Sequence, residues 1–352
     1  MLRLNTLTLM LTFKCNIKCR HCGLSCSPDE TEWMTLDEMI YLTRQADELG
    51  CLNVVLTGGE PTLMKHEDLL TYFRFVKEQT KIKLIRIVTN GLWAKSYDKA
   101  YSLLKDWKEA GLNELNVSCG EYHQEFVPIE RVIYAFNAAN DLKYMTVLLA
   151  GEFIKSEEAR MTPYDFERKL GRRIIQTTEL SPFVHRFVGF NCNSAMNVGR
   201  GYENISDDEI SIAPYERIKS NCDLLINSLA FQPNGRVDAC CGVMVRNHPV
   251  LSFGNWREES ILQLLQQFHD DLIINWIKYL GVKDMKNWLH RKDPNIVFKN
   301  EYINSCDICN DILCNERCLQ LLSEKGMERR EDIILQKTMK EATIFNLNYK
   351  YV

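Results

Sequence analysis

The sequence predicts an α/β fold with a parallel sheet, followed by a smaller cysteine-rich region. Residues 4–13 alternate apolar and polar side chains with a period of two, as a strand does. Short apolar runs then alternate with amphipathic helical patterns to about residue 150, which favours βα units and a parallel sheet, open or closed into a barrel. Beyond about residue 215 cysteines become frequent around a helical stretch at Glu258–Leu280.

The predicted elements follow one another with short connections. Thr35 caps a helix that runs to about Leu49, because Asp37 and Glu38 fall in its first turn. Residues 151–180 are charged and irregular, and we expect an insertion or lid there. The other predicted elements are strands at Val54–Thr57, Ile82–Thr89, Leu112–Ser118, Tyr144–Leu149 and Pro182–Phe190, and helices at His66–Gln79, Ser96–Ala110, Ile129–Asn140 and Glu328–Thr343.

Composition excludes several classes of protein. The chain has 352 residues, 45% of them hydrophobic, and a net charge of −4, which gives no general case for nucleic-acid or anionic-membrane binding. Residues 1–14 are predicted to form a strand and not a signal peptide, and no apolar run is long enough to span a membrane. We therefore expect a cytoplasmic protein, in which the 14 cysteines bind metal more often than they form disulfides.

The first cysteine cluster directly follows the first strand. Cys15, Cys19 and Cys22 have a spacing that suits three corners of a [4Fe–4S] cluster. Three protein ligands leave one iron open to a small molecule, as in a catalytic zinc site. The alternatives are a zinc knuckle or free thiols on a loop. Cys26 is a candidate fourth ligand, but we expect it to be a bystander thiol.

Two further motifs stand at the ends of the next strands. Gly58-Gly59-Glu60 follows the second strand, and Asn90 follows the third. Together with the Cys-x3-Cys-x2-Cys spacing, they resemble the signature of the radical S-adenosylmethionine (radical SAM) superfamily over roughly residues 4–200. The resemblance implies that Cys15, Cys19 and Cys22 hold a [4Fe–4S] cluster whose open iron chelates SAM. It also implies that the Gly-Gly-Glu motif binds the SAM amine.

The fourth strand supplies a further candidate contact. Ser118 lies at its carboxyl end, and we expect it to contact the carboxylate or ribose of SAM. The following segment resembles a Ser-x-Asp-x-aromatic-His-Gln stretch of family members, but Gly120 replaces the Asp. His123 is either a substrate-facing acid/base group or a structural histidine. Strand parity places Cys119 away from the lumen, which favours a packed thiol over a hydrogen-atom donor.

Three other residues of this half have weaker assignments. Cys51 and Cys192 lack partners at ligand spacing and are predicted to be packing residues. Arg200, flanked by glycines, resembles a segment that closes the barrel in many family members. It binds a carboxylate or pairs within the fold.

A second set of cysteines occupies the C-terminal part. These residues resemble the SPASM/twitch extension of radical SAM enzymes, which carries one or two auxiliary iron–sulfur clusters. The full SPASM pattern has a seventh cysteine that this chain lacks, although Cys241 is a spare thiol. The alternative is a structural zinc site at residues 306–318. We expect at least one auxiliary [4Fe–4S] cluster, with Cys222 and Cys240 among its ligands. The spacing does not decide which of the other four candidate ligands join them, namely Cys306, Cys309, Cys314 and Cys318.

The resemblance implies a partial (β/α)6 TIM-like barrel over residues 1–214 and an auxiliary-cluster domain with a helical insertion over residues 215–352. It implies an enzyme that cleaves SAM to a 5′-deoxyadenosyl radical and abstracts a substrate hydrogen. We expect it to epimerise or cross-link a ribosomally made peptide. The alternatives are oxidation or rearrangement of a small molecule such as an amino sugar, or a non-catalytic metal scaffold. Implied partners are an electron donor such as flavodoxin or ferredoxin, and a separate peptide-recognition protein.

Overall fold

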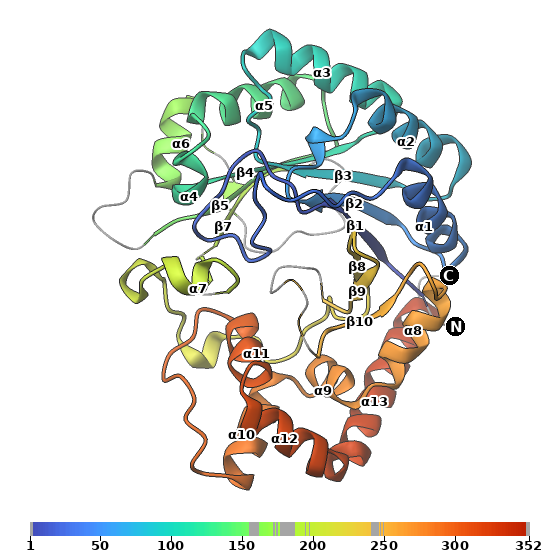
Figure 1. Ribbon diagram of the computed structural model, residues 1–352, viewed down its shortest axis with the longest axis vertical. Coiled ribbons are helices and arrows are strands. Elements are labelled where there is room, and N and C mark those ends of the chain that lie inside the picture. The colour runs from blue at the N-terminus through green and yellow to red at the C-terminus, as the bar shows by residue number, and fades with distance from the viewer. Residues whose placement is uncertain are drawn as a thin grey trace.

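A computed structural model describes residues 3–154, 162–171, 173, 175–176, 187–193, 195–196, 198–240, 246, 248 and 250–349 (Figure 1). A sheet crosses the molecule. Most helices of residues 36–170 lie above it in the view, and the helices of residues 201–204 and 261–349 lie below it (Figure 1). No helix among the described residues is both long enough and apolar enough to cross a membrane.

The sheet confirms the predicted α/β class. Its order is β10-β9-β8-β1-β2-β3-β4-β5-β7-β6. Neighbours from β8 to β6 are parallel, and β9 and β10 are antiparallel additions at one edge. The strands are β1 (Thr6–Thr12), β2 (Asn53–Gly58), β3 (Leu84–Thr89), β4 (Glu114–Gly120), β5 (Thr146–Glu152), β6 (Ile175–Gln176), β7 (Phe187–Asn193), β8 (Ser228–Phe231), β9 (Arg236–Asp238) and β10 (Ser252–Asn255).

Helices connect the parallel strands. In α1, the Thr35 hydroxyl accepts a hydrogen bond from the Glu38 backbone N–H, and the Glu38 carboxylate accepts one from the Thr35 N–H. This reciprocal cap satisfies two backbone donors that the helix cannot pair internally. The helices of this half are α1 (Leu36–Glu48), α2 (His66–Gln79), α3 (Tyr97–Ala110), α4 (Glu121–Gln124), α5 (Ile129–Asp141), α6 (Pro163–Leu170) and α7 (Gly201–Asn204).

Strand β5 ends later than the predicted Tyr144–Leu149. Glu152 lies opposite Gly120 of β4 and Asn193 of β7, so both neighbouring strands pair with β5 to its last residue. This extension places the Glu152 carboxylate at the same edge as the ends of β2, β3 and β4. The predicted strand at Pro182–Phe190 corresponds to β7, which begins at Phe187, while residues 177–186 lie outside the described residues.

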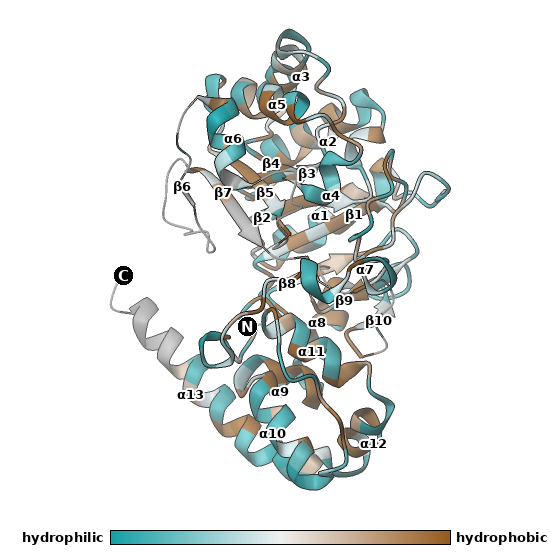
Figure 2. Cartoon of the chain, turned by 90° about the vertical axis from the view of Figure 1, so that its left-hand side faces the viewer, coloured by the Kyte–Doolittle hydropathy of each residue, from teal (hydrophilic) through white to brown (hydrophobic). Residues whose placement is uncertain are grey.

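The C-terminal part joins the same sheet through β8, which pairs with β1. The helical stretch predicted at Glu258–Leu280 is two helices. Asp271 is extended and its carboxylate caps the second helix by accepting from the Ile274 N–H, which breaks the run. The helices here are α8 (Ile261–Asp270), α9 (Leu272–Tyr279), α10 (Val282–Lys292), α11 (Ser305–Leu313), α12 (Glu316–Lys325) and α13 (Arg330–Tyr349). Figure 2 shows α13 extending along the edge of this lower part.

Candidate active site

A cavity of about 410 Å³ opens at the carboxyl ends of the parallel strands. This is where ligands bind in folds built from βα units, because the connecting loops meet there. Its walls come from the loop after β1, the ends of β2 to β5, and the start of α11. The candidate site residues on its walls are Cys15, Cys19, Cys22, Gly58, Gly59, Asn90, Ser118, His123 and Cys306.

The loop after β1 folds so that its three spaced cysteines face one cavity. The Cys15 backbone N–H donates to the Ser27 carbonyl at 3.0 Å, and the Cys22 N–H donates to the Cys19 carbonyl at 3.3 Å. The guanidinium of Arg200 donates to the carbonyls of Cys19 and Cys26. Arg200 therefore pairs within the fold, where it joins the two ends of the cysteine loop.

The protonation of these thiols depends on their burial and on their neighbours. Burial raises the pKa of Cys15 to about 11 and holds the pKa of Cys19 well above its usual range. A hydrogen bond with the Cys26 thiol lowers the pKa of Cys22 and raises that of Cys26. Grouped, buried thiols resist becoming thiolates in the absence of a cation, and a metal cluster removes that penalty by binding the thiolates directly.

The two glycines after β2 allow two backbones to lie unusually close together. A Cβ on Gly59 would stand 2.1 Å from the Lys14 carbonyl oxygen, and one on Gly58 would stand 2.4 Å from the Thr12 carbonyl oxygen. Gly58 also has φ +118°, a conformation that other residues rarely adopt. The glycines thus seat the β2 turn directly against the start of the cysteine loop.

Glu60 lies beneath the cavity and not on its described wall. Its side chain is fully buried, and its carboxylate accepts hydrogen bonds from Thr62, Thr89 and the Asn90 N–H. Burial raises its pKa, which these hydrogen bonds oppose. In this arrangement Glu60 ties the end of β2 to the end of β3.

Asn90 and Ser118 stand on the cavity wall at the ends of β3 and β4. The Asn90 amide donates to the Asn16 side-chain oxygen at 2.7 Å and lies 3.7 Å from the Cys15 sulfur. Asn90 therefore contacts the cysteine loop directly, and Ser118 offers its hydroxyl to the cavity.

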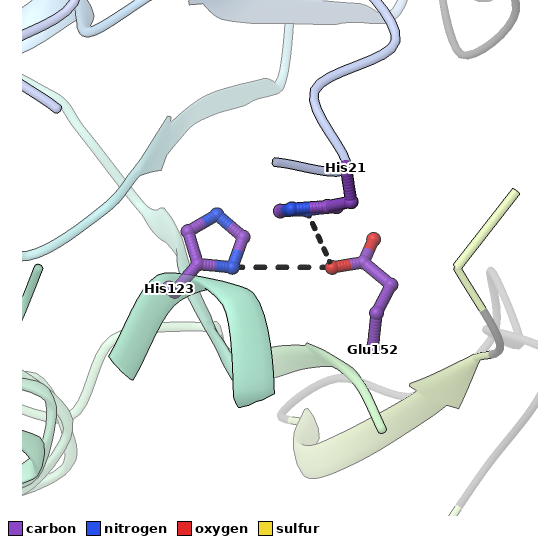
Figure 3. A group of neighbouring side chains, drawn as sticks. All are labelled: His21, His123 and Glu152. Carbon is purple, nitrogen blue, oxygen red and sulfur yellow. Dashed lines mark ion pairs between the residues drawn. The ribbon is translucent and has the colours of Figure 1, made fainter. Parts of the chain in front are cut away.

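Sequence reasoning missed two ionisable residues of the described cavity wall, His21 and Glu152. His21 Nε2 lies 3.1 Å from Glu152 Oε2, and His123 Nδ1 lies 3.9 Å from the same oxygen (Figure 3). Asn90 and Ser118 were identified because they are polar residues at the carboxyl end of a predicted strand. The same criterion did not identify Glu152, because the predicted strand ended at Leu149.

The charges of this group are coupled. Burial disfavours the imidazolium of His21, but the Glu152 carboxylate outweighs this and raises the pKa of His21. Burial likewise opposes ionisation of Glu152, but His21 lowers its pKa overall. Burial, together with the charge of His21, lowers the pKa of His123 to about 4, so His123 is neutral at physiological pH.

The second set of cysteines is partly assembled in the structure. Cys306 and Cys309 are one turn apart on α11, and the thiols of Cys306, Cys222 and Cys314 all raise the pKa of Cys309 electrostatically, after burial. Cys306 also lies on the wall of the cavity that the first cysteines line. Cys318 is fully buried on α12, and Cys240 follows β9.

The other cysteines have varied surroundings. Cys26 is buried on the cavity wall beside Cys22. Cys119 is buried against Gly151 and does not lie on the described cavity wall. Cys51 is buried, and its thiol donates to the Asn53 carbonyl at 3.1 Å. The side chain of Cys192 and all of Cys241 lie outside the described residues.

Comparison with known proteins gives a family match for part of the chain. Residues 9–148 match the family described as the radical SAM superfamily. The GTP 3',8-cyclase of Haemophilus influenzae (strain PittGG) is 30% identical over 199 residues, covering 51% of this chain and 56% of that protein. The probable GTP 3',8-cyclase of Methanocaldococcus jannaschii is 28% identical over 200 residues, covering 54% of this chain and 63% of that protein. The chain thus spans less than two thirds of either relative.

The fold is also similar to that of a solved structure. Streptococcus suis SuiB bound to S-adenosylmethionine superposes with a TM-score of 0.51 and 16% sequence identity, covering 78% of this chain and 68% of that one. This likeness concerns the fold, namely a parallel sheet of the radical SAM type with a C-terminal helical, cysteine-rich region.

Proposed function

We propose that this chain, a radical SAM superfamily protein over residues 9–148, abstracts a hydrogen atom from a ribosomally made peptide in the cavity at the strand ends. One observation carries the proposal. Cys15, Cys19 and Cys22 share the wall of a single cavity with the glycine turn after β2. The cysteines could therefore hold an iron–sulfur cluster next to SAM bound at the glycine turn.

The residues present fit these two groups. Three buried thiols converge from one loop, and a [4Fe–4S] cluster held by them keeps one iron without a protein ligand. When bound, the cluster supplies the electron that cleaves SAM to methionine and a 5′-deoxyadenosyl radical. The Gly58–Gly59 turn offers its backbone to the methionine end of SAM, and Ser118 offers a hydroxyl. Asn90 and Arg200 hold the loop that carries the cysteines.

The C-terminal cysteines are proposed to hold at least one auxiliary cluster. The electrostatic grouping of Cys309 with Cys222, Cys306 and Cys314 supports these four as the ligand set, with Cys240 and Cys318 as the remaining candidates. Because Cys306 lies on the cavity wall, such a cluster adjoins the substrate. That position suits a group that accepts an electron from a substrate radical.

The charges on the cavity wall bear on the substrate. Among the described wall residues there is one carboxylate, Glu152, and neither lysine nor arginine. Phosphate groups are recognised by guanidinium and ammonium groups, so this wall lacks fixed cations for a nucleoside triphosphate. The charge pattern favours a peptide, or a small molecule without phosphate such as an amino sugar, over the substrate in the names of the cyclase relatives.

Two measurements test this proposal. Co-expression with each short peptide encoded beside the gene, followed by mass spectrometry in D2O, should reveal one modified peptide. Loss of two hydrogens indicates a cross-link, and uptake of one deuterium indicates epimerisation. In parallel, GTP should not raise the melting temperature of the cluster-loaded protein. Unmodified peptides together with stabilisation by GTP would instead support a nucleotide substrate, and unmodified peptides alone would support a small molecule.

A further inference from the structure

Three side chains from different elements converge beside the cysteine loop (Figure 3). His21 belongs to that loop, His123 to α4, and Glu152 ends β5. One nitrogen of each imidazole and one oxygen of the carboxylate lie within 4.8 Å of one another. Glu152 Oε2 is 3.1 Å from His21 Nε2 and 3.9 Å from His123 Nδ1. All three residues line the cavity.

Neighbouring groups hold both imidazoles in place. The ring of His21 stacks on Tyr122 at a centroid distance of 4.8 Å and meets His123 edge-on at the same distance. His123 Nδ1 lies 3.2 Å from the Cys119 carbonyl oxygen. A proton on Nδ1 leaves the lone pair on Nε2, and metal-binding histidines usually donate their second N–H to such a carbonyl. The side chains are therefore oriented before any ligand arrives.

An ion pair between His21 and Glu152 does not satisfy every group in this cluster. His21 Nδ1 is buried and has no hydrogen-bond partner among the described residues. Two imidazoles and a carboxylate form a donor set that suits Mn²⁺, Fe²⁺ and Zn²⁺. Ligand atoms around such an ion stand about 3 to 3.5 Å apart, and the 3.1 Å between His21 Nε2 and Glu152 Oε2 lies in this range. His123 would bind the ion through Nε2, because its Nδ1 donates to the Cys119 carbonyl.

We propose that His21, His123 and Glu152 bind a divalent transition-metal ion on the wall of this cavity, separate from the sites that cysteines form. Three protein ligands leave coordination positions open toward the cavity, where an oxygen atom of a substrate can bind. The ion also supplies a positive charge to a wall whose described residues include neither lysine nor arginine. This inference does not depend on the identity of the substrate or on radical chemistry.

Mn²⁺ is a suitable probe, because it prefers oxygen and nitrogen ligands and avoids thiolates. Mn²⁺ is titrated anaerobically into the cluster-loaded protein in its oxidised, EPR-silent state, and the EPR signal of free Mn²⁺ is followed. We expect the wild type to remove one equivalent of the signal. Glu152→Gln and His123→Asn should each weaken binding by about 100-fold, since each replaces a strong ligand by the weaker amide oxygen.

Glu125→Gln is the matched control. Glu125 is a nearby carboxylate that pairs with Arg20 at 2.9 Å and is not part of the cluster, so its variant should bind Mn²⁺ as the wild type does. Circular dichroism and iron content identify any variant that fails to fold. If Glu152→Gln fails to fold, the Mn²⁺ binding of His123→Asn tests the proposal. The proposal is overturned if the wild type binds no Mn²⁺ or if both folded variants bind it as the wild type does. The cluster would then be only an ion pair between His21 and Glu152.

Discussion

The carboxylate of Glu60 accepts a hydrogen bond of 2.8 Å from the backbone N–H of Asn90. This contact joins the end of β2 to the end of β3, and Asn90 in turn contacts the cysteine loop through Asn16. The glycine-glutamate motif therefore organises three neighbouring loops around the cavity.

Glu60→Gln should destabilise the fold. The amide presents an N–H₂ group where a carboxylate oxygen accepted hydrogen bonds, so at least one buried donor of Thr62, Thr89 or Asn90 loses its partner. We expect the free energy of unfolding to fall by about 1 to 3 kcal/mol, measured by urea denaturation. Glu67→Gln, at an exposed position on α2, is the control. An equal effect in both variants would contradict the role assigned to Glu60.

Gly59→Ala should displace the cysteine loop. The new methyl group would stand 2.1 Å from the Lys14 carbonyl oxygen, and backbone cannot yield as a flexible side chain does. We expect a stability loss of about 1 to 3 kcal/mol and a lower iron content after cluster reconstitution. Gly326→Ala is the control, because its methyl group meets only Leu272, at 3.8 Å. Normal iron content in Gly59→Ala would show that the close approach is not needed.

The site residues that belong to recognisable sequence motifs could be predicted from the sequence. Cys15 and Cys19 lie in the loop after β1, Gly58 ends β2 and Asn90 directly follows β3. The carboxyl ends of parallel strands meet at one edge of a sheet. The structure places these residues around one cavity. Their proximity follows from the βα pattern, because each strand delivers its following residue to the same edge.

Other features depend on tertiary contacts that no local pattern encodes. His21 meets Glu152, which lies 131 residues later in the chain, only because β5 pairs with its neighbours beyond Leu149. Strand β8 has four residues and is recognised through its pairing with β1. Cys306 lies on the cavity wall from α11, a helix that Figure 1 shows below the sheet, and the spacing of Cys306 to Cys309 does not predict this position.

His248 should make stability depend on pH. It is buried, and its Nδ1 accepts hydrogen bonds from the backbone N–H groups of Val250 and Leu251. Burial lowers its pKa to about 4, against about 6.5 in the unfolded chain. The unfolded state therefore binds the proton more readily, so this contribution to stability is complete above about pH 6.5 and is lost as the pH falls toward 4.

His248→Asn keeps an acceptor atom near the position of Nδ1 but cannot take up a proton. The loss of unfolding free energy between pH 7 and pH 4.5 should be smaller in this variant than in the wild type, by as much as about 3 kcal/mol. Urea denaturation at several pH values measures the difference. Identical pH dependence in the two proteins would show that His248 is not held neutral by the fold.

The C-terminal cysteines should differ in their importance for iron binding. In a background with Cys15, Cys19 and Cys22 replaced by Ala, any iron–sulfur cluster that remains is auxiliary. There, Cys309→Ser should abolish the remaining iron, since three other thiols act electrostatically on Cys309. Cys318→Ser should retain it. Zinc in place of iron after anaerobic purification would contradict an auxiliary cluster, and iron loss in both variants would return Cys318 to the ligand set.

Formation of 5′-deoxyadenosine tests the central claim most directly. The anaerobically reconstituted protein is mixed with SAM and dithionite, and the product is quantified by liquid chromatography. The wild type should form 5′-deoxyadenosine, and replacing Cys15, Cys19 and Cys22 by Ala should abolish it. Cys51→Ser, a change at a buried cysteine outside the cavity wall, should retain it. Product formation that survives the triple replacement, or a cluster-loaded wild type that forms none, would contradict the assignment of this cavity as a radical SAM active site.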